Sequence, residues 1–249
     1  MKKLIFSYLF IMSTILLIGQ TSSQQLLHII TAQDNFQKEK YANSASQWPI
    51  LNKATIKKER KYLHTQIANL KSLDKTTLSE SEQINQELLL LILEDDLFKL
   101  DYGQYLMPLN AEGGFLTGMV YRTQSLRLNS AEERTDYLKK LQAVPAYLQQ
   151  QTSLLKRGLK DNKVVPKIIV KNCIGYVEDY LNTPIEDLFL AQPLATFQEQ
   201  DKEGLTLLKA QVIPAFRAFK TFLEKDYLPN TRSVAVSYTH LTLPTILRV

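Results

Sequence analysis

The stretch SESEQINQELLLLILEDDLFKLDYG, residues 79–103, decides the fold class. Ser79 and Glu82 have the spacing of a capping box, in which the serine hydroxyl accepts from the backbone N–H of the glutamate and the glutamate side chain reaches back. A helix that begins here is expected to run to about Tyr102, because Gly103 follows and favours a helix C-terminus.

Leu88 to Leu93 is apolar on every face of that helix. We therefore expect this segment to lie in the centre of a hydrophobic core. The next residues, Glu94-Asp95-Asp96, are predicted to form the solvated rim of the buried helix. Successive helical residues point about 100° apart, so these carboxylates have no enforced proximity for acid–base catalysis.

The segments on either side have apolar residues at a period near 3.6 and contain no period-2 run. Helices are expected at Leu26 to Ala42, Thr55 to Leu73, Ser130 to Gln142, Pro145 to Leu159, Pro166 to Leu181 and Lys202 to Tyr227. Thr183 to Glu186 is expected to cap and begin a further short helix. Pro214 should kink the last long helix because proline lacks the N–H and clashes with the preceding turn. The predicted fold class is all-α, an irregular multi-helix assembly.

The composition agrees with a helical fold. Eight Gly and nine Pro among 249 residues are few for a β-sandwich or a β-barrel, and one Cys cannot form an internal disulfide framework. The length is sufficient for a substantial core.

Residues 1–23 have the pattern of a secretory signal peptide. Met1-Lys2-Lys3 is positively charged, and the apolar run from Leu4 to Ile18 is too short for a permanent membrane span. We expect export to the periplasm or the extracellular space, with no stable membrane span after cleavage. An uncleaved membrane anchor is the alternative.

Residues 236–249 are expected not to be native. Val236 to Thr245 matches, codon by codon, the translation of an adapter used in transposase-based sequencing libraries, and a genuine Thr-rich tail is the alternative. A segment of this origin takes no part in the native fold. The folded part is therefore expected to be one truncated helical domain at 24–235.

The charge of the chain changes once both ends are set aside. The whole chain has 30 Lys+Arg against 25 Asp+Glu, a formal net charge of +5. Without Lys2, Lys3 and Arg248, 27 basic residues remain against the same 25 acidic residues, which leaves about +2. This balance is not that of a nucleic-acid-binding domain, so we expect no nucleic-acid partner.

No catalytic motif is evident in 24–235. Zinc hydrolysis on a helix typically needs two His four residues apart and a Glu, whereas His28 and His64 each stand alone. Cys173 lies among apolar residues and is predicted to be a buried core residue, not a nucleophile. We predict no catalytic, cofactor-binding or metal-binding residue in this chain.

The loop Met107 to Phe115 has the most unusual local sequence, MPLNAEGGF. Gly113 and Gly114 permit positive φ angles or close approach of another group to the backbone. Their spacing matches neither a phosphate-binding loop nor a dinucleotide fingerprint. A plain turn is the alternative to a functional loop.

Several separated segments have a familiar order and spacing: Met107 to Asn110, Gly113 to Phe115, Tyr137-Leu138, Leu141 to Leu148, Leu155 to Leu159, Val165 to Lys167 and Phe222 to Arg232. Together they resemble the N-terminal half of a bacterial family known as domain of unknown function 885. The resemblance covers about residues 30 to 235.

The resemblance implies an exported, mainly helical, metallopeptidase-like fold that is more than twice this length. The C-terminal half of such proteins has a His-Glu-x-x-Pro-Gly-His stretch that looks like a zincin site. That stretch is absent here, so zinc is implied for the full-length relative and no cofactor for this fragment. By the same resemblance, Asn110, Gly113, Gly114 and Phe115 are expected to line the active cleft of an intact relative, whose substrate is a peptide.

The leading hypothesis is an N-terminal fragment of an exported zinc-dependent peptidase- or hydrolase-like protein, inactive because its catalytic half is missing. The alternative is an exported helical binding or scaffolding module without catalysis. In the first case, Leu88 to Leu93 and the apolar stripe of the last helix would have packed partly against the missing half. An exposed apolar patch is therefore expected on the fragment.

Overall fold

The computed structural model describes residues 21–41, 48–197 and 201–232. Within these ranges all regular structure is helical, apart from an isolated bridge between Pro166 and Arg232. The predicted all-α class is confirmed. Of the expected signal peptide only residues 21–23 are described, and the expected non-native segment 236–249 lies outside the described residues.

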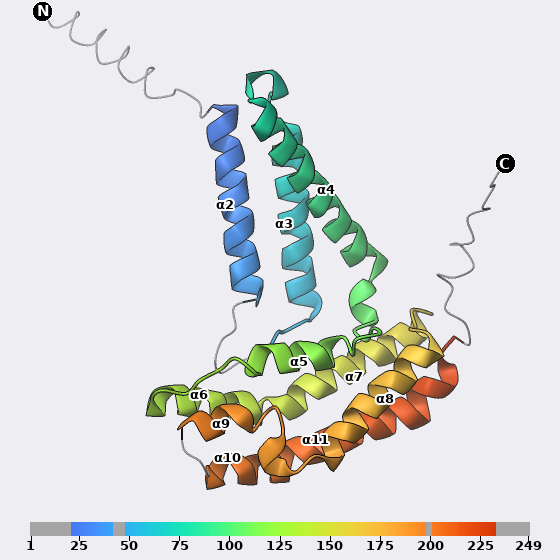
Figure 1. Cartoon of the computed structure of the whole chain (residues 1–249). Coiled ribbons are helices and arrows are strands. Elements are labelled where there is room, and N and C mark those ends of the chain that lie inside the picture. Colours follow the sequence, from blue (N-terminus) through green and yellow to red (C-terminus); the bar gives the residue numbers. More distant parts are fainter. Residues whose placement is uncertain (1–20, 42–47, 198–200, 233–249) are drawn as a thin grey trace, which may run out of the picture. The chain divides into compact units, whose positions relative to one another are not determined.

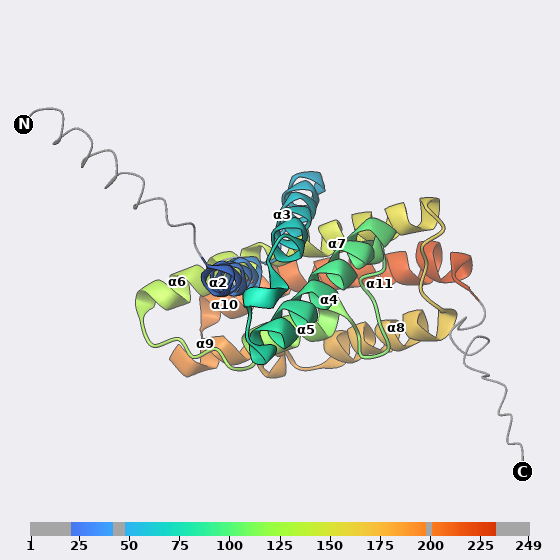
Figure 2. The same cartoon turned by 90° about the horizontal axis from the view of Figure 1, so that it is seen from above.

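The chain divides into two compact units (Figures 1 and 2). The first contains residues up to 41 together with 56–98, and the second contains 42–55 and the residues from 99 onward. None of the helices in the described ranges combines the length and the apolar character that crossing a membrane requires.

The first unit is built from α2 (Ser22–Tyr41) and most of α3 (Lys53–Lys71) and α4 (Glu80–Tyr102). The rings of Phe36 and Tyr62 stack between α2 and α3 with centroids 3.9 Å apart. An ion pair of 2.6 Å joins Lys71 on α3 to Glu94 on α4. These contacts hold the three helices side by side.

The capping box at the start of α4 is confirmed. The backbone N–H of Glu82 donates to Ser79 Oγ at 3.4 Å, and that of Ser79 donates to Glu82 Oε2 at 2.8 Å. These bonds satisfy two of the backbone donors that every helix N-terminus leaves free.

The expected central burial of residues 88–93 is wrong. Leu93 is fully buried, but Leu88, Leu91 and Ile92 are 54%, 65% and 52% exposed. Within this unit α4 packs against its neighbours along one face only, so an all-round apolar sequence leaves its outer face in water. Together with Ile84, which is 52% exposed, these residues form an exposed stripe, here called the α4 stripe.

The second unit contains seven further α-helices within the described ranges. They are α5 (Phe115–Thr123), α6 (Ala131–Gln142), α7 (Val144–Lys160), α8 (Lys167–Asn182), α9 (Gln192–Phe197), α10 (Lys202–Leu207) and α11 (Ile213–Phe222). α11 packs against both α7 and α8, and α6 packs against α10. Figure 2 shows α8 and α11 running alongside each other. The helices α5 and α9 are additional to those expected from the sequence.

The segment 202–227 is helical throughout, but its hydrogen bonding changes twice. π-Helical turns at Leu208–Val212 and Leu223–Tyr227 flank α11. Pro214 lies in the first turn of α11, directly after the first π turn, so the change of pattern occurs where proline has no N–H to donate.

The apolar stripe of this segment is buried within the second unit: Leu208, Val212, Phe216, Phe219 and Leu223 are each at most 2% exposed. The expectation that the stripe contributes to an exposed patch is wrong, because α7 and α8 cover it.

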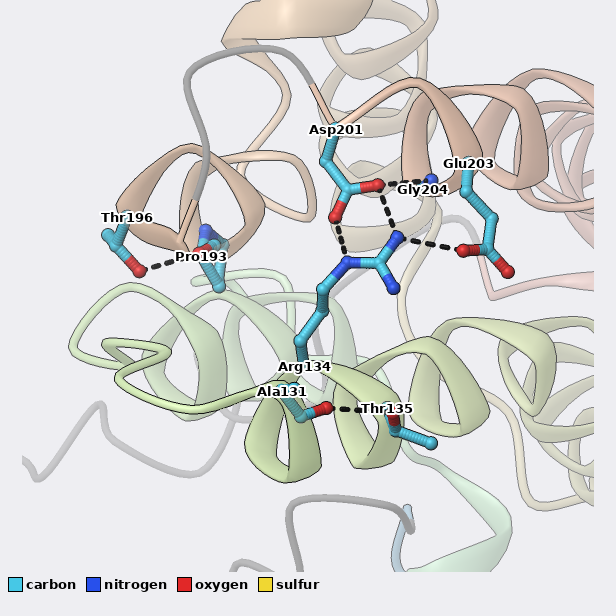
Figure 3. A network of polar contacts seen from close by, with 8 residues as sticks. All are labelled: Ala131, Arg134, Thr135, Pro193, Thr196, Asp201, Glu203 and Gly204. Atoms are coloured by element: carbon cyan, nitrogen blue, oxygen red, sulfur yellow. Dashed lines mark hydrogen bonds and ion pairs between the residues drawn. The ribbon is translucent and has the colours of Figure 1, made fainter.

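An ion-pair network joins α6 to the start of α10 (Figure 3). Arg134 Nε and Nη2 donate to the two carboxylate oxygens of Asp201 at 2.5 and 2.8 Å, and Nη2 also contacts Glu203 at 2.8 Å. Asp201 Oδ1 additionally accepts from the N–H of Gly204 at 2.9 Å, as a helix cap. The side chain of Asp201 is 1% exposed. A buried carboxylate is thus satisfied by a bidentate guanidinium and a backbone donor.

One predicted helix start is wrong. Thr183 does not cap a new helix, because its hydroxyl donates back to the carbonyl oxygen of Asp179 at the end of α8. The following residues, Ile185–Asp187, form only a single 3-10 turn without a side-chain cap. This turn directs the chain back across the end of α8.

Candidate functional site

A pocket of about 630 Å³ lies in the second unit, between α5, α8 and the segment that follows α8. Its buried floor consists of apolar and aromatic residues: Leu116, Val177, Tyr180, Leu188 and Phe216. The volume is in the range of small-molecule and side-chain binding sites. This pocket is the candidate functional site.

Three carboxylates line the exposed part of the pocket. Glu112 comes from the loop before α5, Asp179 from α8, and Asp187 from the 3-10 turn after α8. Among the described residues, none of the three takes part in an ion pair, and no Lys, Arg or His lines the pocket. The lining is therefore acidic at its rim and apolar at its floor.

Aromatic rings form much of the floor. The ring of Tyr180 lies 4.3 Å from that of Phe216 and 5.2 Å from that of Phe189, measured between centroids. Tyr180 is 8% exposed, and its hydroxyl has no hydrogen-bond partner in the described structure. Burial raises the pKa of this phenol, so it stays neutral.

The loop singled out in the sequence builds one edge of this pocket. Asn110 Oδ1 accepts from the N–H groups of Glu112 and Gly114 at 2.9 and 2.7 Å. Gly113 and Gly114 have φ angles of 101° and 65°. A Cβ on Gly114 would clash with the carbonyl oxygen of Pro108. Glycine is thus required at position 114, where both the positive φ angle and the close backbone approach that the sequence permits are present.

The four predicted cleft residues lie beside the pocket lining. Ala111 and Glu112, which separate Asn110 from Gly113, are the loop residues that line it. A Cβ on Gly113 would lie 3.6 Å from Cδ2 of the pocket residue Tyr176.

Phe115 points elsewhere, with its ring centroid 5.8 Å from that of Tyr147 and 5.4 Å from that of Phe219. That the four residues line the active cleft of an intact relative stays a prediction.

Sequence reasoning missed the pocket residues on α8 and after it. Tyr176 precedes Asp179 and Tyr180 by three and four residues, and Thr183 follows the same two residues by four and three, which places all of them on one helix face. This helix face, which combines aromatic and acidic residues, is the feature of the sequence from which the pocket residues on α8 could have been predicted. Asp187 had no such signal, because its position depends on the turn after α8.

The prediction that Cys173 is a buried core residue is confirmed, and the two histidines lie apart from it on other helices. His28 on α2 and His64 on α3 are exposed. Cys173 on α8 is fully buried, and burial raises the pKa of its thiol to about 11. The described residues contain no group of three or more His, Cys, Asp or Glu that could hold a metal ion.

A second cluster of unusual groups surrounds a buried lysine. Lys140 on α6 is 0% exposed, and its ammonium lies 4.9 Å from the centroid of the Trp48 ring. The indole N–H of Trp48 donates to the carbonyl oxygen of Lys140 at 2.9 Å. Burial, and secondarily the charge of Arg122, lower the pKa of Lys140 to about 8. The cation–π contact with Trp48 compensates part of the cost of burying this charge.

Two of the segments that suggested a family relationship, Val165 to Lys167 and Phe222 to Arg232, contact each other in the second unit. The N–H of Val165 donates to the hydroxyl of Tyr227 at 3.3 Å, and the N–H of Lys167 donates to the carbonyl oxygen of Arg232 at 2.8 Å. Residues 36–241 match the family described as "Bacterial protein of unknown function (DUF885)". The matched range extends into the segment expected to be non-native, up to residue 241. No curated protein is similar enough to be matched.

Proposed function

Because the chain belongs to the DUF885 family of bacterial proteins, we propose that it forms the helical, substrate-binding part of an exported zinc-dependent peptidase- or hydrolase-like protein. Other parts of the intact protein would supply the catalytic zinc site. The chain by itself would bind part of a peptide and would not hydrolyse it.

The pocket in the second unit carries this proposal. It combines a buried apolar floor with an exposed carboxylate rim, and the glycine loop 110–114 holds Glu112 at its edge. Peptide-binding clefts recognise side chains with concave surfaces of this kind. The fixed loop fits a role in positioning substrate, because its backbone cannot easily adopt another conformation.

The described residues do not fit a catalytic zinc site of their own. His28 and His64 are exposed on separate helices, and Cys173 is buried with its thiol protonated. Zinc in a catalytic site requires three converging protein ligands and an open position. We therefore derive no catalytic step from the residues of this chain.

The α4 stripe supports the idea that further polypeptide packs on the first unit. Ile84, Leu88, Leu91 and Ile92 share one face of the helix and are all more than half exposed. Apolar patches of this kind are typical of surfaces that are covered by another protein segment.

The test is to read the gene past the codon for Ala235 and to express its intact product. We expect a downstream helix with paired His and Glu, bound zinc in a ratio of one per chain, and hydrolysis of unstructured peptides that a chelator abolishes. Replacing both Gly113 and Gly114 by Ala in that product should lower peptide turnover. An intact product with neither bound zinc nor hydrolysis would contradict the proposal.

The second candidate function is an exported helical binding module without catalysis. The pocket favours it equally, because a built binding site serves recognition as well as catalysis. A stop codon soon after that of Arg232 in the intact gene, together with retained ligand binding, would select this alternative.

A further inference from the structure

We propose that the pocket between α5, α8 and the 187–189 segment binds an organic cation attached to an apolar body. In the setting of the proposed function, on which this identification rests, that ligand is the free N-terminal residue of a peptide with an aromatic or aliphatic side chain. The apolar side chain occupies the floor, and the α-ammonium lies at the rim.

The floor provides the apolar half of this recognition. The ring of Tyr180 contacts those of Phe216 and Phe189, with centroid separations of 4.3 and 5.2 Å. Leu116 and Leu188 complete a surface that water solvates poorly. Burying an apolar side chain there removes hydrocarbon surface from water on both partners.

The rim provides the cationic half. Glu112, Asp179 and Asp187 carry three negative charges on three different segments, and no described residue neutralises them through an ion pair. Unpaired acids on separate segments around one opening attract a cation and repel phosphates and carboxylates. The aromatic faces of the floor add a cation–π attraction for an ammonium that approaches them.

Tyr180 gives an observation that is independent of the carboxylates. It lines the pocket, it is more than nine-tenths buried, and its hydroxyl has no partner. The hydroxyl oxygen is enclosed by protein, so a ligand on the floor contacts the ring of Tyr180 and not this oxygen.

The direct test uses two small probes that share the same ring. Phenethylamine is charged at pH 7, whereas 2-phenylethanol is its neutral counterpart of similar shape. Calorimetric titration of the full chain should show the amine binding at least tenfold more tightly than the alcohol. Equal affinity of the two probes, or binding of neither, would overturn the inference.

Matched variants locate the binding site. Asp187→Asn and Asp179→Asn should each weaken phenethylamine binding severalfold and leave the weak binding of 2-phenylethanol unchanged. Glu186→Gln is the control, because Glu186 is an exposed neighbour of Asp187 and does not line the pocket. An equal loss in the control would mean that the effect is one of overall charge, and would overturn the inference.

Tyr180→Phe is a further control, because it keeps the ring that the ligand contacts and removes only an enclosed, unpartnered hydroxyl. It should raise the melting temperature of the free chain and leave phenethylamine binding unchanged. A severalfold loss of amine binding would contradict the placement of the ammonium at the rim.

A peptide pair then connects the pocket with the proposed function. The tripeptide Phe-Ala-Ala should bind at pH 6.5, where its α-ammonium is protonated, and its N-acetylated form should bind at least tenfold more weakly. If the chain prefers the free N-terminus but the intact product hydrolyses no peptide, the cation-binding inference stands and the peptidase proposal is rejected. If the intact product hydrolyses peptides but the chain shows no such preference, the peptidase proposal stands and the cation-binding inference is rejected.

Discussion

Gly158 of α7 lies directly against the carbonyl oxygen of Leu106, in the turn that follows α4. A Cβ at position 158 would be 2.7 Å from that oxygen and 2.6 Å from the carbonyl oxygen of Lys163. Both neighbours are backbone atoms, so they cannot yield as a flexible side chain would. The absence of a side chain at Gly158 therefore allows two loops to close over the end of α7.

Gly158→Ala should accordingly lower the free energy of unfolding by about 2 kcal/mol, the usual cost of forcing an extra methyl into a packed site. Gly175→Ala in α8 is the matched control, because its Cβ would meet nothing within 4 Å. It should stabilise the protein by up to about 1 kcal/mol through helix propensity. Urea unfolding followed by circular dichroism measures both, and similar effects of the two substitutions would contradict the prediction.

Asp201→Asn should lower the unfolding free energy by about 3 kcal/mol, because it breaks a buried charge pair with Arg134 and weakens the cap of α10. Glu203→Gln provides the comparison: Glu203 contacts the same guanidinium but its side chain is 69% exposed. It should cost less than about 1 kcal/mol. Chemical unfolding of the two variants at pH 7 decides between these expectations.

The pair of Asp201 and Arg134 also makes the unfolding free energy depend on pH in the acidic range. Hydrogen bonds from Arg134 lower the pKa of the Asp201 carboxyl below its ordinary value. Its contribution is therefore fully present above the unfolded-state pKa of about 4 and is lost as pH falls through the lower folded-state pKa. Asp201→Asn should show a smaller loss of stability below about pH 4 than the unmodified chain. An unchanged acid dependence would mean that other carboxylates dominate.

Local signals in the sequence predicted most helix starts. Ser79 and Ser130 each cap a helix as expected, with Ser130 Oγ accepting from the N–H of Glu133 at 3.1 Å. The start of α5 has no such signal: its cap, Gly114, has no side chain, so the helix depends on the fold of the preceding loop. α9 has only six residues, which is too short for a period to be recognised.

Tertiary packing determines which apolar side chains are buried, and the periodicity of the sequence does not specify this. The all-round apolar pattern of residues 88–93 indicates a helix with many apolar side chains, but it does not specify how many neighbours cover them. In the candidate site, Glu112, Asp179 and Asp187 come from three segments with no shared motif, and only the fold brings them to one opening. The loop at residues 107–115 could be identified from the sequence, because the adjacent Gly113 and Gly114 indicate an unusual backbone conformation.

Lys140 should make stability rise with pH in the alkaline range. Its pKa is lowered to about 8 in the folded chain by burial, whereas the unfolded chain keeps its proton to about pH 10.4. Between these values the unfolded state binds more protons, so the unfolding free energy increases with pH, by on the order of 3 kcal/mol in total. Lys140→Met should remove this rise in unfolding experiments between pH 7.5 and 10. A variant that retains the rise would assign it to other groups.

Cys173 should be nearly inert toward thiol reagents in the folded chain. Its side chain is fully buried and its thiol pKa is raised to about 11, so only about one molecule in a thousand carries a thiolate at pH 8. Labelling by a chromogenic disulfide should therefore be slow in buffer and fast in denaturing urea. A Cys173→Ala, Ala218→Cys double variant is the control, because Ala218 is exposed on α11 and its replacement should react at once in buffer. Rapid labelling of the unmodified folded chain would show that α8 opens far more readily than its packing against α11 implies.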